Sequence, residues 1–363
     1  MTATDADTDA PGRGEPHDDA TGGTADVEAV LDEVGRTVRR AMLDAIPDGE
    51  PHSWLYRLAR NYPSRPGKAL RPALCLATCR AFGGRDADAL PLAVAIEMLH
   101  NAFLVHDDIV DGSLRRRGRP TLVAEHGSGL ALNAGDALAV LANRVLRRHL
   151  RSFERELADR IVEEFETMAL RTLEGQATEL GWRHDRVADL VPEDYLDLIM
   201  HKTCWYTTIH PLRVGALVGS GGRADLRAMV RFGFHLGAAF QIRDDLLNLV
   251  GDGDVYGKEV DGDLYEGKRT LVLIHLVEQA QGADRATVAA YLAMGRRERT
   301  DDVVAEIRRL IDRYGSLDFA AEYGRGIAAA ALATFDAAFA PALPGPDTDF
   351  VRALIPYVLG RHL

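Results

Sequence analysis

The stretch "LPLAVAIEMLHNAFLVHDDIVD", residues 90–111, indicates the fold more clearly than any other part of the chain. Up to Val105 it is apolar on nearly every side, which predicts a helix buried within a bundle rather than one on a surface. Glu97 and the three aspartates at its end make it a poor membrane span. Those aspartates, Asp107, Asp108 and Asp111, are three and four residues apart, so a helix projects their carboxylates to one side.

Helical periodicity continues along the rest of the chain. Apolar residues recur at three- and four-residue spacing, and no stretch shows sustained two-residue alternation. We therefore predict an all-α fold, with later helices near residues 129–150, 152–180, 192–219, 223–250, 268–281, 284–294, 301–313, 316–340 and 347–360. Residues 1–24 are rich in Asp, Thr, Gly and Pro and are predicted to be a disordered acidic tail, with a single domain over residues 25–363.

The composition narrows the possible functions. The chain has 363 residues and a formal net charge of -12, which argues against nucleic acid as the main partner. Its three cysteines, Cys75, Cys79 and Cys204, are interpreted as buried small side chains rather than metal ligands or disulfides. No segment resembles a signal peptide or a long uncharged apolar run, which predicts a cytoplasmic protein without a membrane span.

A second acidic cluster repeats the first. "RDDLLN", residues 243–248, also closes an apolar helical segment, and it places Asp244, Asp245 and Asn248 at the spacing of "HDDIVD". A hard divalent cation relieves the repulsion within such clusters, and Mg²⁺ typically binds one or two carboxylates together with substrate phosphates. If the two clusters act together, they face each other across one cavity.

Basic residues follow both acidic clusters. They are Arg115, Arg116, Arg117 and Arg119 after the first and Lys258, Lys268 and Arg269 after the second, with Lys68, Arg71 and Lys202 elsewhere in the chain. Arginine and lysine side chains suit phosphate oxygens. Around paired magnesium clusters, the set predicts a substrate that carries diphosphate, and room for two such substrates.

Several motifs, in their order along the chain, resemble the all-trans isoprenyl diphosphate synthase (polyprenyl synthetase) family, and within it geranylgeranyl diphosphate synthases. They are "PGKALRP", "LHNAFLVHDDIVDGSLRRRGRPT", "NAGDALAVLA", "EGQATEL", "HKT", "FQIRDDLLNLVGD" and "YGKEVDGDLYEGKRT", and the similarity runs from about Pro66 to "YVLGRHL". The resemblance implies a single-domain orthogonal helical bundle around a central apolar cavity, and a homodimer. It also implies a prenyltransferase of isoprenoid and terpenoid biosynthesis that uses three Mg²⁺ ions per active site. Such an enzyme joins isopentenyl diphosphate to an allylic diphosphate such as geranyl or farnesyl diphosphate.

The resemblance also implies roles for individual residues. It assigns Mg²⁺, and through it the allylic diphosphate, to Asp107, Asp108, Asp111, Asp244 and Asp245, with Asn248 as a further candidate metal ligand. Direct contacts with that diphosphate fall to Arg116, Lys202, Lys258 and Lys268, and isopentenyl diphosphate falls to Lys68, Arg71, His100 and Arg117. Thr203 and Gln241 would line the place where the allylic cation forms.

Three features depart from the family pattern. Asn248 stands where many members have Asp, and Ala69 replaces a frequent basic residue. The segment "KTCWYTTIHPL", residues 202–212, is bulky where members often carry smaller residues. Pro211 is predicted to kink or end that helix. Trp205 and Tyr206 are either ordinary core aromatics or part of the chain pocket.

Product length is predicted from the buried helix. Phe103 lies four residues before Asp107, on the same face and about 6 Å deeper, and Ala102 beside it is small. In the resembled family, bulk at these positions acts as a floor for the growing chain. This combination predicts a geranylgeranyl (C20) product.

Two other functions remain open from the sequence. The first is a terpene cyclase of the same helical fold that acts on a single prenyl diphosphate. Such an enzyme has no use for a second diphosphate site, so Lys68, Arg71, His100 and Arg117 argue against it. The second is a non-catalytic partner subunit of a heteromeric synthase, which the intact "DDIVD" disfavours.

Overall fold

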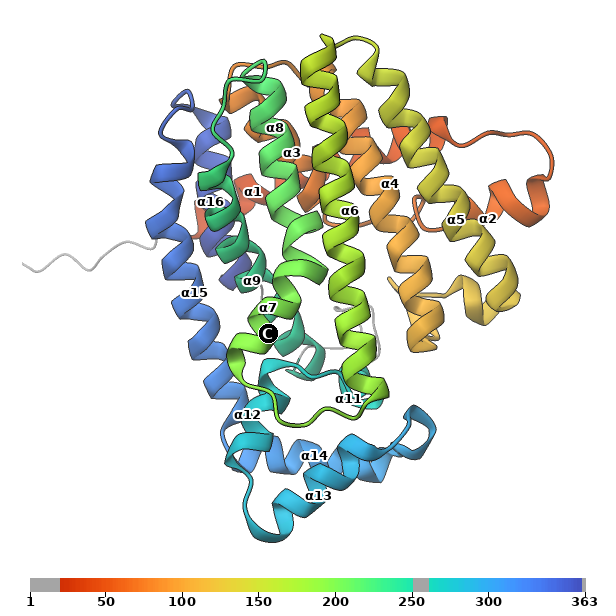
Figure 1. Ribbon diagram of the computed structural model, residues 1–363, viewed down its shortest axis with the longest axis vertical. Helices are drawn as coiled ribbons and strands as arrows, with labels where there is room; N and C mark the ends of the chain where they lie inside the picture. The colour runs from red at the N-terminus through yellow and green to blue at the C-terminus, as the bar shows by residue number, and fades with distance from the viewer. Residues whose placement is uncertain (1–19, 251–260, 361–363) are drawn as a thin grey trace, which may run out of the picture.

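The computed structural model describes residues 20–250 and 261–360, and helices make up most of the described chain (Figure 1). The α-helices are α1 (Ala20–Ala45), α2 (Arg57–Ala59), α3 (Leu70–Ala81), α4 (Asp86–Asp111), α5 (Leu122–Leu150), α6 (Arg155–His184), α7 (Pro192–Ile199), α8 (His210–Gly219), α9 (Arg227–Val250), α11 (Gly262–Glu266), α12 (Leu271–Gln279), α13 (Gly282–Ala293), α14 (Asp301–Arg313), α15 (Ser316–Phe339) and α16 (Pro346–Gly360). Two π-helices, η1 (His52–Tyr56) and η2 (Met200–Ile209), and one 3₁₀ helix, η3 (Arg296–Glu298), accompany them. The predicted all-α class is confirmed.

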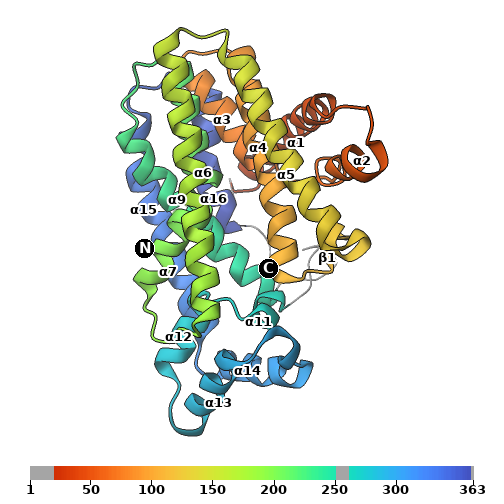
Figure 2. The same ribbon diagram turned by 45° about the vertical axis from the view of Figure 1, so that its right-hand side comes forward.

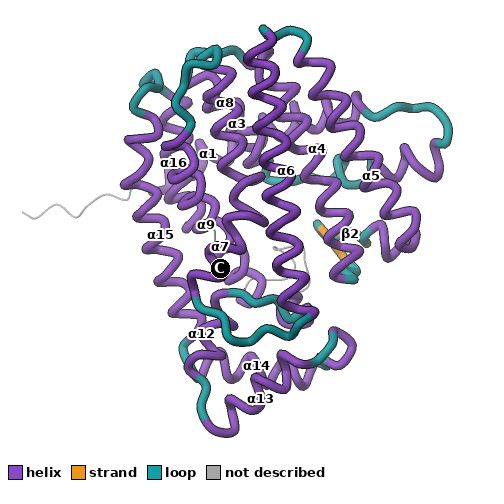
Figure 3. The backbone as a smooth tube through the Cα atoms, in the orientation of Figure 1, coloured by secondary structure: helices purple, strands orange, loops and turns teal. Residues whose placement is uncertain are grey.

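Two short strands form the described sheet structure (Figure 3). They are β1 (Arg115–Arg116) and β2 (Arg119–Pro120), paired antiparallel directly after α4. The start of the chain also differs from the prediction. Helix α1 begins at Ala20, inside the segment predicted to be a disordered tail, and residues 1–19 lie outside the described residues.

The bundle contains two apolar clusters. Helices α1, α3, α4, α5, α6, α8 and α16 build the first cluster, and η2, α7, α12, α13 and α14 contribute to the second. Helices α9 and α15 contribute to both clusters and so join them. In Figures 1 and 2 the lower ends of α4, α6 and α9 converge near α11. The two acidic clusters lie in the last turns of α4 and α9.

Helix α4 is the buried helix that the sequence predicts. Asp86 and Asp88 in its first turn complement the helix dipole, and Gly112 ends it in a left-handed conformation at φ 63°. By length and composition α4 is apolar enough to cross a membrane, yet 67% of its most apolar window is buried inside the protein. The hydrophobic effect therefore already accounts for its composition.

Helices α3 and α8 pack backbone against backbone. A Cβ added to Gly215 would lie 2.5 Å from the Cys75 carbonyl oxygen, and one added to Gly219 would lie 2.3 Å from that of Cys79. Only glycine allows this approach. Cys75, Cys79 and Cys204 are free and buried, which confirms that they are small core side chains.

The chain stays helical from Pro192 to Gly219, although Pro211 lies within that span. Pro211 occupies the first turn of α8, where a missing backbone N–H costs little. The preceding ten residues form the π-helix η2. Of the two predicted outcomes, a kink or an end, the helix does not end at Pro211. The π-helical segment before it is of a kind that is frequent at functional sites.

Candidate active site

The two acidic clusters border one cavity of about 960 Å³. The predicted site residues that line it are Lys68, Arg71, His100, Asp107, Arg116, Arg117, Lys202, Thr203, Gln241, Asp244, Asp245 and Lys268. They come from α3, α4, α9, η2, the loops before α3 and before α12, and the β1–β2 hairpin after α4. Tertiary packing thus brings together residues that are up to 200 positions apart. Lys258 lies outside the described residues.

A tight hairpin divides the arginine triplet. Arg117 and Gly118 both have positive φ, 51° and 72°, as a two-residue type I′ hairpin turn requires. Arg116 is buried, whereas Arg115 is exposed and donates to the Gly118 carbonyl at 2.8 Å. The turn therefore separates Arg115 from the two arginines that line the cavity.

Arg116 is anchored to the first acidic cluster. Its Nε and Nη2 lie 2.7 and 2.6 Å from the same oxygen of Asp108, which is fully buried. The Tyr62 hydroxyl donates to the other Asp108 oxygen. Burial lowers the pKa of Arg116, but Asp108 and Asp107 outweigh it, so the pKa is raised and the guanidinium stays charged. Asp108 thus orients an arginine rather than lining the cavity itself.

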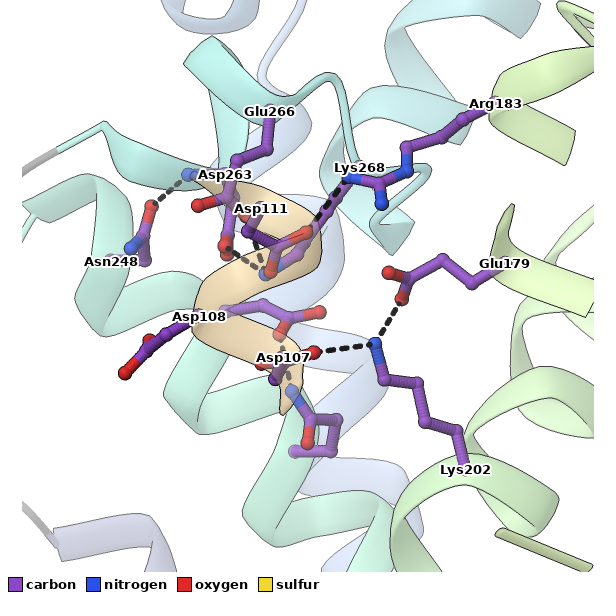
Figure 4. Close-up of polar contacts among 12 residues, drawn as sticks. Asp107, Asp108, Asp111, Glu179, Arg183, Lys202, Asn248, Asp263, Glu266 and Lys268 are labelled. Carbon is purple, nitrogen blue, oxygen red and sulfur yellow. Dashed lines mark hydrogen bonds and ion pairs between the residues drawn. The ribbon is translucent and has the colours of Figure 1, made fainter. Parts of the chain in front are cut away.

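Lys202 reaches the first cluster from the opposite wall. Its Nζ lies 2.8 Å from Glu179 of α6 and 3.8 Å from Asp107 (Figure 4). A Cβ added to Gly175 would lie 2.2 Å from the backbone nitrogen of Lys202, so glycine sets how closely α6 and η2 approach. Burial lowers the pKa of Lys202, but Glu179 and Asp107 raise it by more than burial lowers it. The pKa of Lys202 is therefore raised, and its ammonium remains charged.

Asp111 is enclosed by two cations. Arg183 lies 3.0 Å from one carboxylate oxygen, and the Lys268 ammonium lies 3.4 Å from the other. Lys268 also lies 3.4 Å from Asp263 and 2.6 Å from Glu266 (Figure 4). Lys268 therefore bridges the first acidic cluster and helix α11, which follows the second cluster in the chain.

The second cluster contains a buried carboxyl whose surroundings disfavour the ionised form. Asp245 accepts hydrogen bonds from the Tyr195 hydroxyl at 2.8 Å and from Gln241 Nε2 at 2.6 Å. Burial and the neighbouring Asp263 nevertheless raise the pKa of Asp245 well above its usual range. Asn248 is placed differently, because its amide oxygen accepts from the backbone N–H of Asp263 at 3.0 Å. That bond ties Asn248 to the start of α11, and Asn248 does not line the cavity.

The residues assigned to isopentenyl diphosphate line the same cavity and come from the loop before α3, from α3, from α4 and from the hairpin after α4. Gly67 lies against Arg117, because a Cβ added there would be 3.0 Å from the guanidinium. Arg71 donates to the Thr207 hydroxyl at 2.9 Å. Ala69, which replaces a basic residue, is buried and packs close to Gly35 of α1. A long basic side chain at position 69 would have to displace that helix.

The two residues expected to set product length differ in position. Ala102 is fully buried in the core and does not line the cavity. Phe103 is half-buried, is also absent from the cavity wall, and meets the Tyr206 ring edge to face at 6.0 Å. Tyr206 lines the cavity, whereas Trp205 packs into the second apolar cluster. The sequence left open whether Trp205 and Tyr206 are core aromatics or part of the pocket. In the structure Trp205 is a core residue and Tyr206 is part of the cavity wall.

The donor set fits Mg²⁺, although among the described residues no group of three or more His, Cys, Asp or Glu side chains is spaced to hold a metal ion. Asp108 is paired with Arg116, and Asp111 is paired with Arg183 and Lys268. The fit rests on Asp245, a buried carboxyl whose pKa is raised by burial and by the neighbouring Asp263 and Asp244. A bound cation would offset the repulsion among these carboxylates. Carboxylate oxygens are the ligands that Mg²⁺ prefers.

Six residues of the site carried no assignment from the sequence: Tyr62, Glu179, Arg183, Tyr195, Asp263 and Glu266. Glu179 falls within the motif "EGQATEL", and Asp263 and Glu266 fall within "YGKEVDGDLYEGKRT", which was the available signal. Tyr62 and Tyr195 had none, because only packing brings their hydroxyls to buried aspartates.

A helical bundle with two carboxylate clusters and a set of cations around one cavity defines a class of enzyme that handles diphosphate esters with Mg²⁺. The polyprenyl synthetase family model matches residues 52–311. The chain is 35% identical to the geranylgeranyl diphosphate synthase of Sulfolobus acidocaldarius over 266 residues, 73% of this chain and 79% of the relative. It is 32% identical over 277 residues to a short chain isoprenyl diphosphate synthase of Methanothermobacter thermautotrophicus, covering 76% and 82% of the two chains.

Solved structures agree with the sequence comparisons. The geranylgeranyl pyrophosphate synthetase of Pyrococcus horikoshii superposes with a TM-score of 0.80 at 29% identity, over 93% of this chain and 99% of the other. The polyprenyl synthase of Caulobacter crescentus also gives 0.80, at 26% identity over 93% and 98%. The chain belongs to the polyprenyl synthetase family. It is a prenyltransferase of the isoprenyl diphosphate synthase class, and enzymes of this family use Mg²⁺.

Proposed function

We propose that the protein condenses isopentenyl diphosphate with an allylic prenyl diphosphate and releases geranylgeranyl diphosphate. One observation carries the proposal: two separate sets of cations border a single cavity. Lys202 and Lys268 lie 3.8 and 3.4 Å from aspartates of the first cluster, whereas Lys68, Arg71 and Arg117 line the cavity from the loop before α3, from α3 and from the hairpin after α4. Two diphosphate sites suit a two-substrate condensation, whereas a cyclase needs one.

The residues divide the chemistry between the two sites. The allylic C–O bond breaks and its electron pair goes to the departing diphosphate, where the charges of Arg116, Lys202 and Lys268 stabilise it. Mg²⁺, when bound, supplies further charge stabilisation for that diphosphate. Thr203 and Gln241 line the cavity where the allylic cation forms.

The second substrate then closes the carbon–carbon bond. Lys68, Arg71, His100 and Arg117 hold isopentenyl diphosphate so that its double bond attacks the allylic carbon. The proton lost from the adduct goes to the departing diphosphate, so no protein base is needed. Apolar walls contributed by residues such as Leu104 and Phe240 exclude water, which would otherwise capture the cation.

We propose Asp107, Asp111, Asp244 and Asp245 as the carboxylates that take up Mg²⁺, three ions per site by family resemblance, and Asp108 as the anchor of Arg116. The contacts of Asn248 with the backbone of α11 leave it out of this set. Counting Mn²⁺ retained by the protein together with a non-hydrolysable diphosphate analogue tests the number. Fewer than three ions per chain would contradict it.

The C20 product is supported by the aromatic pair Phe103 and Tyr206 and by relatives named geranylgeranyl diphosphate synthases. Other relatives are named farnesyl, geranylfarnesyl and nonaprenyl diphosphate synthases, so the family does not decide length. Length depends on the shape of the apolar end of the cavity. A mass measurement on the products is therefore required.

One assay tests the condensation. Purified protein with Mg²⁺ is incubated with isotopically labelled isopentenyl diphosphate and geranyl or farnesyl diphosphate, and products are identified by mass after dephosphorylation. We expect labelled geranylgeraniol. Hydrocarbon without label would instead support the cyclase, and label in a much longer alcohol would correct the product length alone.

A homodimer is supported by exposed apolar side chains on α5 and α6, two helices that are consecutive in the chain. Leu132 and Val140 of α5 are 50% and 69% exposed, and Leu170 and Leu173 of α6 are 58% and 56% exposed. Apolar faces of this kind are usually covered by a partner. Light scattering coupled to size exclusion tests the dimer, with Leu170→Glu expected to yield monomer. The cytoplasmic location stays a prediction.

A further inference from the structure

Tyr206 contacts residues that are assigned to two different functions. The guanidinium carbon of Arg71 lies 4.5 Å from the centroid of its ring, and the His100 ring stacks on it at 5.6 Å. The Phe103 ring meets it edge to face at 6.0 Å and 78°. One side chain therefore contacts two residues assigned to isopentenyl diphosphate and the residue assigned to product length.

Arg71 is held by two consecutive residues of η2. The Tyr206 ring lies against the guanidinium, and the Thr207 hydroxyl accepts from its Nη2 at 2.9 Å. Thr207 is fully buried, so its hydroxyl is fixed by packing. A cation on an aromatic face and a hydrogen bond in a set direction restrict the orientation of an otherwise flexible side chain. A pre-oriented arginine loses less entropy when it binds diphosphate.

Tyr206 also stands between the cavity and Phe103. Tyr206 is part of the cavity wall and Phe103 is not. Tyr206 lies four residues beyond Lys202, and Phe103 lies four residues before Asp107, so each is about one turn from the diphosphate-binding end of its helix. A growing chain in the cavity would therefore meet the Tyr206 ring before it could reach Phe103.

We infer that Tyr206 performs two tasks: it positions Arg71 for isopentenyl diphosphate, and it closes the chain end of the cavity with Phe103 behind it. The inference rests on the proposed condensation and deepens it. It also explains the bulk of "WYTT", because Tyr206 and Thr207 both contact Arg71, while Trp205 packs in the second apolar cluster. Affinity for isopentenyl diphosphate and product length are then linked through one ring.

Variants at neighbouring positions separate the two tasks. Tyr206→Leu removes the ring, Tyr206→Phe keeps it, and Thr207→Val removes only the hydroxyl that holds Arg71. Phe103→Leu removes only the second ring of the barrier. Trp205→Phe is the matched control, since it changes an adjacent aromatic that lies outside the cavity wall.

The readouts are KM for isopentenyl diphosphate, kcat at saturation, and product mass. We expect Tyr206→Leu to raise that KM between about 2-fold and 30-fold, the range for loss of one cation–π contact. Its kcat should change less, and its main product should be longer by at least one five-carbon unit. Tyr206→Phe should retain the KM and product length that Tyr206→Leu loses. Thr207→Val should raise KM without changing product length.

Three results would overturn the inference. One is a Tyr206→Leu enzyme with the wild-type KM and product. Another is Phe103→Leu lengthening the product while Tyr206→Leu does not, which would make Phe103 the sole floor. The third is Trp205→Phe reproducing both changes, which would point to general distortion of η2. If Tyr206→Leu fails to fold, Tyr206→Met serves in its place.

The wild-type protein in the same assay separates this inference from the proposed function. A wild type that forms no prenyl diphosphate refutes the condensation. An active wild type whose variants behave alike refutes only the role of Tyr206.

Discussion

His210 should make the protein sensitive to mild acid. It is fully buried in the first turn of α8, and its ring meets Phe165 of α6 edge to face at 4.5 Å. Burial, with a smaller effect of Arg213, lowers the pKa of His210 from 6.5 to about 3. The folded protein therefore keeps this imidazole neutral at pH 5, whereas the unfolded chain protonates it.

The sign and size of the effect follow from linkage. Because the unfolded chain binds more protons, the free energy of unfolding falls as pH drops below about 6.5, and it keeps falling until about pH 3. With these two pKa values, a change from pH 7 to pH 5 costs about 2 kcal/mol. A variant at His210 is measured beside the wild type. Because both proteins carry the same carboxylates, the pH-dependent contribution of those carboxylates to stability cancels in the comparison.

Urea unfolding at pH 7 and pH 5, followed by tryptophan fluorescence, measures the effect. His210→Phe keeps an aromatic ring against Phe165 and removes the titrating group, so it should lose about 2 kcal/mol less than the wild type between the two pH values. His184→Gln is the control, since His184 is exposed and should not alter the difference. Equal losses in wild type and His210→Phe would refute the reasoning. His210→Leu offers a second replacement if the larger ring does not fit.

Three further predictions concern the site. Chelation of divalent ions should abolish condensation, and Mg²⁺ with pyrophosphate should raise the thermal midpoint; at 100 times Kd the gain in stability is about 2.7 kcal/mol. Arg117→Gln should raise the isopentenyl KM at least about 10-fold more than Arg115→Gln does, because loss of a charged contact costs about 1.5–3 kcal/mol and Arg115 is exposed; equal effects would contradict the assignment. Gly175→Ala should lower activity and the unfolding midpoint, because its Cβ would lie 2.2 Å from the Lys202 nitrogen. Gly181→Ala on the same helix meets nothing within 4 Å and is its control.

Much of the architecture could be predicted from local pattern. Helices α14 and α15 lie at or within one residue of the predicted bounds, because each has a clear apolar stripe and a glycine at its end or start. Helix α5 begins earlier than predicted, at Leu122, because the Thr121 side chain caps it by accepting from the Ala124 N–H at 3.2 Å. Gly127, at φ 76° and ψ 167°, interrupts the helical geometry inside α5, so the predicted start near residue 129 falls just after that break.

The candidate site divides in the same way. Spacing alone indicated that Asp107, Asp108 and Asp111 share one face, since helical periodicity is a local property. It could not assign different partners to them. Asp108 is held by Arg116 and Tyr62, while Asp111 is enclosed by Arg183 and Lys268.

By itself, the sequence determined the helical class, the two acidic clusters and the cations that accompany them, because each of these follows from residue type and short-range spacing. The tertiary structure decided what those residues contact. In the folded protein the Asn248 amide oxygen accepts from the backbone of α11, and Ala102 is buried away from the cavity. Tyr206 lines the cavity wall, and Phe103 does not. Such outcomes depend on contacts between helices that are distant in the chain, and no local pattern encodes which face of one helix meets which side chain of another.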